Sequence, residues 1–303
     1  MEKNELIKIF SDKNIGKVMF DEPMKNHTSF KIGGPVDVMV VPYSEDELVN
    51  AIKLCRDNNI QFYIMGNGTN LLVRDGGMRG AVIKINEGLN KVTIDGDKVY
   101  CQAGALITGV SRLALSHSLT GFEFANGIPG TIGGAVTMNA GAYGGEVKDV
   151  ITRVRVLDRD NNIIEYTNSE MNFRYRGSRV VDEGLIVLSM EMELRPGNYE
   201  EIEAVMKDLT FKRTSKQPLE LPSAGSTFKR PEGHFAGKLI DDAGLRGLRY
   251  RGAQVSEKHC GFVVNIDNAT CADVTNLISV VQKTVRDKFG VELEMEIKLI
   301  GED

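Results

Sequence analysis

Three short segments of the chain carry side chains that could do chemistry. Residues 173–178, FRYRGS, set two arginines among aromatic side chains just before a strand-like run. Residues 224–231, AGSTFKRP, put Ser226 on a glycine turn close to cations. Residues 292–297, ELEMEI, alternate acidic and apolar side chains, so a strand here would direct its glutamates to one face. Taken singly, each segment also fits a structural role: a solvated cation pair, a turn serine or a solvated strand face.

The serine and the histidines do not follow the usual hydrolase or metal-site patterns. The sequence around Ser226 lacks G-x-S-x-G, and nothing links it with His234 in a catalytic triad. The four histidines are too scattered to suggest a metal, so we expect structural or substrate-contacting roles for them. The four cysteines include no C-x-x-C pair, and only His259 stands beside a cysteine. We therefore expect buried free thiols and no metal site.

Two glycine-rich loops could bring the backbone close to a phosphate-bearing ligand. Residues 66–72, GNGTNLL, follow a strand-like run, where backbone N–H groups can converge on an anion. This loop fails G-x-G-x-x-G because Leu71 stands at the third glycine position, and alone it fits a tight turn equally well. Residues 126–146 hold seven glycines, a density that we expect no regular element to tolerate, and their apolar side chains favour an ordered loop over disorder. Close packing of bare backbone would also use such glycines, but two such loops indicate a large, extended cofactor with phosphate groups.

Hydrophobic periodicity and capping patterns indicate the elements that must position these segments. Residues 44–47, SEDE, form a capping box that opens a helix with Leu48, Ala51, Ile52 and Cys55 on one face. We expect helices at residues 44–57, 106–118, 199–214 and 272–289, strands at 37–41, 62–65, 150–157, 163–166, 185–194 and 292–300, and a hairpin around 95–97. This mixture predicts an α+β fold and not a doubly wound sheet.

Composition narrows the class of protein. The 303 residues include 42% apolar and 26% charged side chains, as in ordinary globular proteins, with a net charge of −5 that disfavours nucleic-acid binding. No apolar stretch approaches the roughly 20 residues that cross a bilayer, and the charged first residues do not resemble a secretory signal. We therefore expect a cytoplasmic protein that binds neither nucleic acid nor membrane and needs no obligatory protein partner.

In this order, these segments resemble the UDP-N-acetylenolpyruvoylglucosamine reductase family. The resemblance covers nearly the whole chain, from residues 26–35, NHTSFKIGGP, to residues 294–298, EMEIK. Its most specific parts are the loop at residues 127–146 and the Gly-Ser-x-Phe-Lys turn at residues 225–229. The first glycine loop alone would not identify the family.

The resemblance implies an α+β fold with two lobes. The larger would be an FAD-binding lobe of the vanillyl-alcohol-oxidase type at residues 1–197, made of two α+β subdomains at about 1–75 and 76–197. A tail strand at residues 291–303 would return to it. A smaller α+β lobe at residues 198–290 would bind the substrate.

The resemblance also implies an activity and a set of site residues. The family reduces UDP-N-acetylglucosamine enolpyruvate to UDP-N-acetylmuramate with NADPH, through non-covalently bound FAD, in the peptidoglycan synthesis that supports cell wall biogenesis, cell shape and cell division. By this likeness the catalytic arginine is Arg176, the proton-donating serine is Ser226 and the acid is Glu296. The implied substrate-binding residues are Arg213, Lys216, Lys229 and His259. The implied FAD-binding residues are Gly66, Asn67, Gly68, Thr69, Asn70, Leu71, Gly127, Ile128, Pro129, Gly130, Thr131, Gly133, Gly134, Asn139, Ala140, Gly141 and Tyr143.

The chain departs from the family's pattern in three places. Arg230 stands where many relatives have asparagine after Phe-Lys, and Arg251 stands where a second glycine is usual. The short stretch between Arg176 and Ser226 is similar to the compact form of the family, which lacks an extra tyrosine-bearing substrate loop.

Two other functions are compatible with parts of the sequence. An FAD-dependent oxidase acting on an alcohol or sugar would share the glycine loops but has no evident need for Arg176, Ser226 and Glu296 together. A non-catalytic nucleotide-binding protein or sensor would bind a UDP-sugar without taking up FAD. Flavin content and reactivity with oxygen distinguish them.

Overall fold

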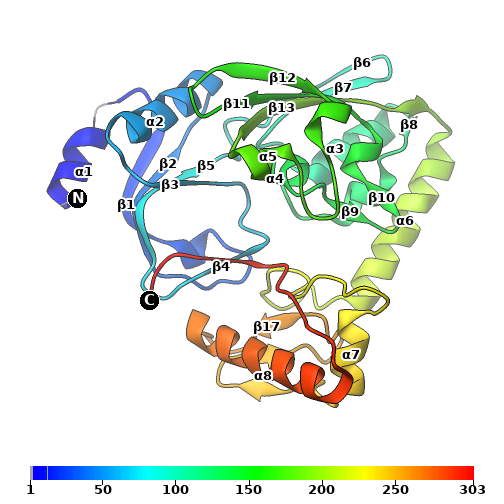
Figure 1. Ribbon diagram of the computed structural model, residues 1–303. Helices are drawn as coiled ribbons and strands as arrows, with labels where there is room; N and C mark the ends of the chain where they lie inside the picture. The colour runs from blue at the N-terminus through cyan, green and yellow to red at the C-terminus, as the bar shows by residue number, and fades with distance from the viewer. Residues whose placement is uncertain (1–2, 12) are drawn as a thin grey trace. The chain divides into compact units, whose positions relative to one another are not determined.

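The computed structural model describes residues 3–11 and 13–303, which divide into two compact units (Figure 1). The first unit comprises Met1–Met19, Met39–Asn67 and Ala81–Arg213. The second unit comprises Phe20–Val38, Gly68–Gly80 and Thr214–Asp303. The predicted mixture of helices and strands is confirmed.

A helix between two strands follows early in the chain, as the sequence pattern predicted. Helix α2 (Glu45–Asp57) connects β2 (Pro35–Val41) to β3 (Phe62–Met65) and buries Leu48, Ala51, Ile52 and Cys55. The Ser44 hydroxyl accepts a hydrogen bond from the Glu47 N–H at 3.2 Å, which satisfies one open donor of the first turn. The Glu47 carboxylate accepts from the Tyr43 N–H and not from Ser44, so the reciprocal half of the expected capping box is displaced by one residue. A four-stranded sheet has the order β1-β2-β5-β3, with β1 (Lys17–Pro23) and β5 (Met78–Lys84); helix α1 spans Lys3–Phe10.

The first unit also contains a five-stranded antiparallel sheet. Its strand order is β12 (Ile163–Thr167), β11 (Ile151–Leu157), β13 (Ile186–Glu193), β7 (Lys98–Gln102) and β6 (Val92–Asp95). Val154, Met190 and Cys101 oppose one another across β11, β13 and β7 and are buried. Helices α3 (Ile107–Ser116), α4 (Ile132–Thr137) and α5 (Arg179–Glu183) lie on one side of this sheet (Figure 1). The opposite face carries polar residues.

Helix α4 corrects one expectation, because it forms inside the glycine-rich region where no regular element was predicted. The Ile132 N–H donates to the Ala105 carbonyl at 2.9 Å, and the Gly133 N–H donates to the Ala103 carbonyl at 2.8 Å. These bonds satisfy donors that a helix start otherwise leaves open. A Cβ on Gly133 would lie 3.1 Å from the Ala103 Cβ, so glycine permits this close approach. Partners distant in sequence therefore stabilise a helix that local propensity disfavours.

The second unit is built around a long helix. Helix α8 (Cys271–Phe289) begins with a capping box between Thr270 and Asp273 and ends at Gly290, which adopts a φ of +69°. Its buried face meets α7 (Ala236–Asp242) and an antiparallel sheet of β15 (Arg249–Tyr250), β16 (Ala253–Val255) and β17 (Val263–Asn265) (Figure 1). Helix α6 (Tyr199–Lys216) precedes these elements along the chain, and both α6 and α8 confirm predicted helices.

The tail strand is shorter than predicted. Strand β18 covers only Lys298–Ile300 and pairs in parallel with β4 (Leu71–Val73). Residues 292–297 form no continuous strand, although Leu293 and Ile297 are buried as the alternation predicted. The remaining short elements are β8 (Leu119–Thr120), β9 (Gly141–Ala142), β10 (Gly145–Glu146), β14 (Arg195–Pro196) and the 3₁₀ turns η1 (Met24–Asn26), η2 (Glu123–Gly127), η3 (Val147–Asp149) and η4 (Ser169–Met171).

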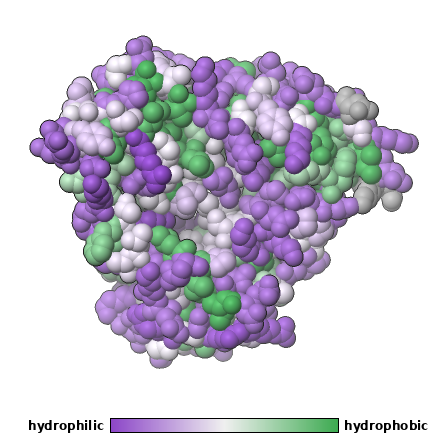
Figure 2. Space-filling view, turned by 180° about the vertical axis from the view of Figure 1, so that it is seen from behind, coloured by the Kyte–Doolittle hydropathy of each residue, from purple (hydrophilic) through white to green (hydrophobic). Residues whose placement is uncertain are grey.

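Hydrophilic residues dominate the face of the molecule that Figure 2 shows. On the face shown in Figure 2, apolar residues form scattered patches among polar ones. Across residues 3–11 and 13–303, we find no helix of the length and apolar character that crossing a bilayer requires. The cysteines Cys55, Cys101, Cys260 and Cys271 are buried free thiols, as expected, and burial raises the pKa of Cys55, Cys101 and Cys271 to about 12.

Candidate active site

Backbone pairing in the second unit places Glu296 beside the Ser226 turn. The Glu296 N–H donates to the Thr227 carbonyl at 2.9 Å, and the Lys229 N–H donates to the Glu294 carbonyl at 2.9 Å. The predicted acid and the predicted proton donor, far apart in sequence, therefore lie on adjacent antiparallel segments. Both side chains are half-buried.

Two further contacts hold this pair of segments. The Thr227 hydroxyl, which is buried, accepts from the Val263 N–H of β17 at 2.9 Å. The Asn70 side chain donates to the Glu296 carbonyl at 3.2 Å, and the Asn70 carbonyl accepts from the Lys298 N–H at 2.8 Å. Asn70, which the resemblance assigned to FAD binding, thus also supports the backbone at Glu296.

Two predicted substrate-binding residues of the second unit differ in their surroundings. Lys229 forms an exposed ion pair with Glu294 at 2.7 Å. Because an exposed ion pair contributes little free energy, a phosphate could replace Glu294 as the partner of Lys229 with little loss. His259 is half-buried, and desolvation lowers the pKa of its imidazole. Its Nδ1 accepts from the Gly261 N–H at 3.1 Å, so the proton of the neutral ring sits on Nε2, ready to donate.

Arg176 occupies a two-residue turn of the first unit. The Arg174 N–H donates to the Gly177 carbonyl at 3.0 Å, and the Gly177 N–H donates back to the Arg174 carbonyl at 3.1 Å. Arg176 adopts a φ of +54°, in the left-handed region that non-glycine residues rarely use. Its guanidinium lies 5.0 Å from the centre of the Tyr175 ring. The turn thus holds the predicted catalytic arginine in an unusual but defined conformation.

Arg213 lies against the second glycine loop. Its Cδ would be 2.7 Å from a Cβ on Gly127, so the missing side chain at Gly127 makes room for the arginine stem. Desolvation lowers the pKa of the Arg213 guanidinium, and the nearby Tyr143 partly offsets this decrease. Among the described residues no carboxylate pairs with Arg213. A partly desolvated cation without a protein counter-ion fits the binding of an anionic ligand.

Asn126 is a further candidate that the sequence analysis did not select. Its Nδ2 donates to the Thr210 hydroxyl at 3.0 Å, but its buried Oδ1 has no partner among the described protein atoms. It precedes Gly127 directly, so it adjoins the contact with Arg213. Only the tertiary structure reveals such an unsatisfied acceptor, because the sequence alone shows an ordinary asparagine before a glycine.

The glycines of the loops divide into two kinds, and this division tests whether FAD fits. A Cβ on Gly66 would lie 2.2 Å from the Thr131 hydroxyl oxygen, and one on Gly145 would lie 2.5 Å from the Phe124 ring. A Cβ on Gly134 would meet only the Thr131 hydroxyl oxygen, at 3.7 Å, and one on Gly144 would meet nothing within 4 Å. Close packing therefore explains the first two glycines. Gly144 adopts a φ of +89°, which favours glycine whatever the space around it. Gly134 has no such conformation, and its open space leaves room for a ligand against bare backbone, which fits an extended cofactor.

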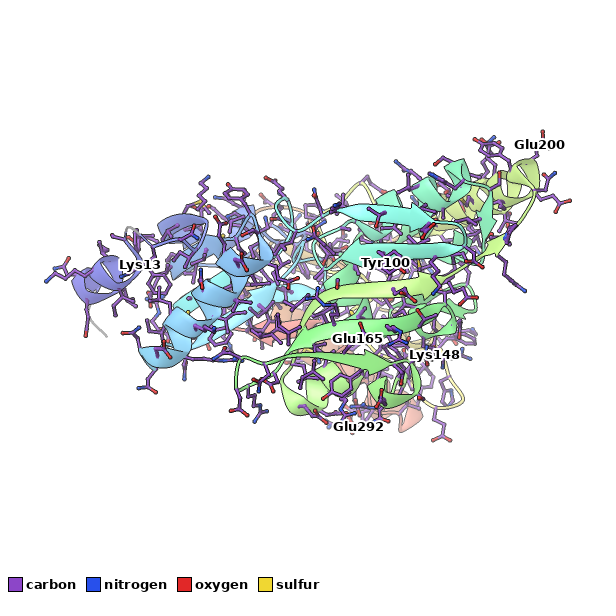
Figure 3. All side chains as sticks on the ribbon, turned by 90° about the horizontal axis from the view of Figure 1, so that it is seen from above. Lys13, Tyr100, Lys148, Glu165, Glu200 and Glu292 are labelled. Carbon is purple, nitrogen blue, oxygen red and sulfur yellow. The ribbon has the colours of Figure 1, made fainter. Side chains whose placement is uncertain are left out.

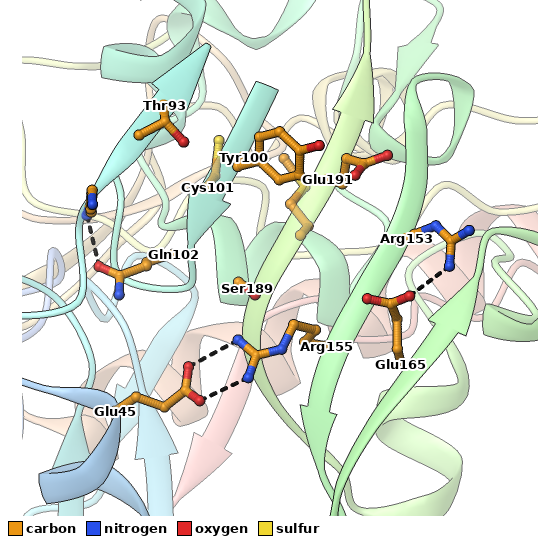
Figure 4. Close-up of a pocket in the computed structure, with 12 residues that line it drawn as sticks. Glu45, Thr93, Tyr100, Cys101, Gln102, Arg153, Arg155, Glu165, Ser189 and Glu191 are labelled. Carbon is orange, nitrogen blue, oxygen red and sulfur yellow. Dashed lines mark hydrogen bonds and ion pairs between the residues drawn. The ribbon is translucent and has the colours of Figure 1, made fainter. Parts of the chain in front are cut away.

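A polar groove of about 260 Å³ lies on the outer face of the five-stranded sheet (Figure 4). Arg155 forms a two-point ion pair with Glu45 at 2.9 and 3.1 Å, and Arg153 pairs with Glu165 at 2.6 Å. Figure 3 shows the same face from above, with Tyr100 and Glu165 labelled. None of the predicted site residues lines this groove. In the parts of the chain that the structure describes, no cluster of histidine, cysteine or carboxylate side chains could hold a metal ion.

Comparisons with known proteins relate this chain to a family of flavoenzymes. Residues 217–300 match the C-terminal domain of UDP-N-acetylenolpyruvoylglucosamine reductase, and residues 36–167 match the FAD binding domain. The predicted α+β fold with an FAD-binding lobe is thereby confirmed.

Several relatives match along nearly their full length. The UDP-N-acetylenolpyruvoylglucosamine reductase from Caldanaerobacter subterraneus subsp. tengcongensis is 56% identical, over 95% of this chain and 95% of its own length. The UDP-N-acetylenolpyruvoylglucosamine reductase from Clostridioides difficile is 52% identical, over 98% of this chain and 97% of its own length. The crystal structure of a UDP-N-acetylenolpyruvylglucosamine reductase from Thermus caldophilus is similar with a TM-score of 0.80 and 32% identity, covering 93% of this chain and 98% of that one. The chain belongs to the UDP-N-acetylenolpyruvoylglucosamine reductase family.

Proposed function

We propose that this chain reduces UDP-N-acetylglucosamine enolpyruvate to UDP-N-acetylmuramate in the cytoplasm, with NADPH as reductant and FAD as cofactor. Full-length similarity to reductases of this name supports the reaction. The observation in the structure that carries the proposal is the backbone pairing that sets Glu296 beside the Ser226 turn. We retain the division into an FAD-binding lobe at residues 1–197, joined by the tail at 291–303, and a substrate lobe at 198–290.

The chemistry that FAD would supply when bound is hydride transfer from NADPH to the terminal carbon of the enolpyruvyl group. The residues that would hold it lie in the two glycine loops, where Gly134 leaves open space beside the backbone. The Asn126 side-chain Oδ1, which is buried and has no partner among the described protein atoms, would accept a hydrogen bond from a ligand in the same region.

Arg176 would bind the substrate carboxylate and stabilise the charge that develops during reduction. Once the terminal vinyl carbon gains hydride, an electron pair accumulates at the neighbouring carbon and spreads into the carboxylate. Arginine's planar fork matches a carboxylate through two hydrogen bonds, and a fixed cation lowers the barrier most where charge develops. Glu296, if protonated, would donate a hydrogen bond to the same carboxylate, whereas an ionised Glu296 would oppose the charge.

Ser226 would complete the reaction by protonating that neighbouring carbon. A new C–H bond forms as the Ser226 O–H bond breaks, and the serine regains its proton from solvent. A hydroxyl is a weak acid, so it suits only a strongly basic acceptor such as an enolate carbon. Gly225, at a φ of +79°, forms the turn that presents Ser226.

The remaining cations would recognise the sugar nucleotide. Arg213, Lys216 and Lys229 would neutralise the diphosphate, and His259 would donate from Nε2. Of these, the partly desolvated Arg213 has the strongest physical case, because no carboxylate of the described chain compensates its charge.

The visible spectrum and the NADPH dependence of the purified protein test this function. A yellow protein whose NADPH oxidation requires UDP-N-acetylglucosamine enolpyruvate is the expected result. A yellow protein that ignores this compound, and whose reduced flavin reacts rapidly with oxygen, would instead be an oxidase. A colourless protein that cannot be reconstituted with FAD would refute the cofactor assignment.

A further inference from the structure

The Asn139 side chain is buried and satisfied within the protein. Its Nδ2 donates to the Glu146 carboxylate at 3.0 Å and to the Arg174 carbonyl at 3.2 Å. Its Oδ1 accepts from the Lys148 N–H at 3.2 Å. Its exposed fraction is 0%. Because both N–H groups of the amide are used, the side chain has no donor left for a cofactor.

One of these partners belongs to the turn that carries Arg176. The Arg174 carbonyl accepts from the Gly177 N–H, which closes the turn, and from Asn139, which anchors it. On the other side of the turn, the buried Ser178 hydroxyl donates to the Thr137 carbonyl at 2.8 Å. The turn is therefore anchored at both ends to residues 137–139, within the second glycine loop.

The conformation of Arg176 explains why such anchors are needed. A left-handed φ in a non-glycine residue persists only where its surroundings enforce it. Without the bond to the Arg174 carbonyl, the turn could relax towards more favourable backbone angles and move the guanidinium. A misplacement of about 1 Å at a reacting centre can cost about 10²-fold in rate.

The charges around Asn139 hold its amide in one orientation. Lys148 forms an ion pair with Glu146 at 2.7 Å, and this bond, with help from Asn139 and nearby Arg176, lowers the pKa of the Glu146 carboxyl. Glu146 thus stays ionised at neutral pH and accepts from Nδ2. The Lys148 N–H, a donor, requires an acceptor at Oδ1. A flipped amide would break all three bonds, so the geometry dictates which atom faces the Arg174 carbonyl.

We propose that Asn139 is a positioning residue, which holds the Arg176 turn on the glycine loop so that the guanidinium meets the substrate carboxylate. The proposal rests on the catalytic role proposed for Arg176. In this proposal the side chain of Asn139 holds the turn, whereas its backbone remains part of the glycine loop proposed to bind FAD. The same loop would then place both the cofactor and the arginine that acts on the substrate.

The test measures the two half-reactions separately by stopped-flow absorbance in the FAD-loaded enzyme. Asn139→Ala, Arg176→Ala and the double variant are compared with the parent protein. We expect Asn139→Ala to reduce its flavin with NADPH within about twofold of the parent rate, but to reoxidise it with substrate roughly 10²-fold more slowly. In the Arg176→Ala background, adding Asn139→Ala should cause no further loss, because residues that act as a unit are not additive.

Several controls separate positioning from folding. Asn139→Asp keeps the shape and the acceptor for Lys148 but loses both N–H donors, so it should behave like Asn139→Ala; parent-like rates would overturn the proposal. Asn265 is also buried, with hydrogen bonds to the Phe30 carbonyl and the Ala269 N–H, so Asn265→Ala should lower the melting temperature without separating the two half-reactions. If Asn139→Ala does not fold, Ser178→Ala removes only the second anchor and should show the same separation.

The possible outcomes distinguish this inference from the proposed function. Additive losses in the double variant, or equal losses in both half-reactions, would overturn the role of Asn139 alone. An Arg176→Ala variant that reoxidises at the parent rate would instead refute the role proposed for Arg176.

Discussion

The adjacent glycines of helix α4 offer a sharp test of where FAD approaches the chain. A Cβ on Gly134 would meet nothing nearer than the Thr131 hydroxyl oxygen at 3.7 Å, so Gly134→Ala is compatible with the folded protein. Alanine in a helix interior is more stable than glycine by roughly 0.5–1 kcal/mol. We therefore expect the FAD-free Gly134→Ala variant to be at least as stable as the parent protein.

The same substitution should weaken FAD binding if the cofactor lies against this backbone. Forcing an extra methyl into a packed contact costs about 1–3 kcal/mol. Since about 1.4 kcal/mol corresponds to a tenfold change, the affinity for FAD should fall roughly 5- to 150-fold. Titration of the FAD-free protein with FAD, followed by flavin fluorescence, measures this change.

Gly133→Ala is the matched variant on the same helix. Its Cβ would lie 3.1 Å from the Ala103 Cβ and 3.3 Å from the Ala103 carbonyl oxygen, so the neighbouring chain must shift. We expect a lower melting temperature for the FAD-free Gly133→Ala protein, in contrast to Gly134→Ala. A folded Gly134→Ala protein that binds FAD within twofold of the parent would refute the argument, as would equal destabilisation of both variants.

Three further predictions concern single residues. Ser226→Ala should retain flavin reduction by NADPH but lose about 10²–10⁴-fold in reoxidation by substrate, and equal loss in both half-reactions measured by stopped flow would contradict the proton-donor role. The pKa of His259 in the folded chain lies below its ordinary value of 6.5, so at lower pH the unfolded chain binds a proton more readily than the folded chain. The contribution of His259 to the free energy of unfolding should therefore be present above pH 6.5 and be lost as the pH falls through the folded pKa. In a series of urea-unfolding measurements across this pH range, His259→Gln should flatten this dependence. Arg213→Met should raise KM for the sugar nucleotide but leave the melting temperature equal or higher, because it removes a partly desolvated cation that pairs with no described carboxylate. A large drop in melting temperature would show instead that the charge of Arg213 is compensated within the protein.

Local elements were the part of the fold that sequence patterns predicted best. Helix α2 begins after Ser44 and buries the four predicted apolar positions, and α8 spans almost the predicted residues. The signals that predicted these helices are local: an apolar period for both and, for α2, a capping side chain. The tail strand was predicted too long because alternating burial of Leu293 and Ile297 does not require continuous pairing, and only Lys298–Ile300 finds a partner strand.

The family of the protein could be recognised largely from the sequence. Residue types, their order and the resemblance identified the family, and they predicted which glycine loops and charged residues form its site. The sequence could not separate glycines needed for packing, such as Gly66, from glycines with open space, such as Gly134. That distinction depends on which atoms lie opposite each missing Cβ.

Only the tertiary structure decided how these residues support one another. Helix α4 forms because the carbonyls of Ala103 and Ala105 accept its first N–H groups, which no local pattern indicates. Glu296 reaches the Ser226 turn through backbone hydrogen bonds, and Asn139 reaches the turn of Arg176 through one amide N–H. Such contacts join segments that are distant in sequence, and their partners are chosen by packing and hydrogen-bond satisfaction in the folded chain.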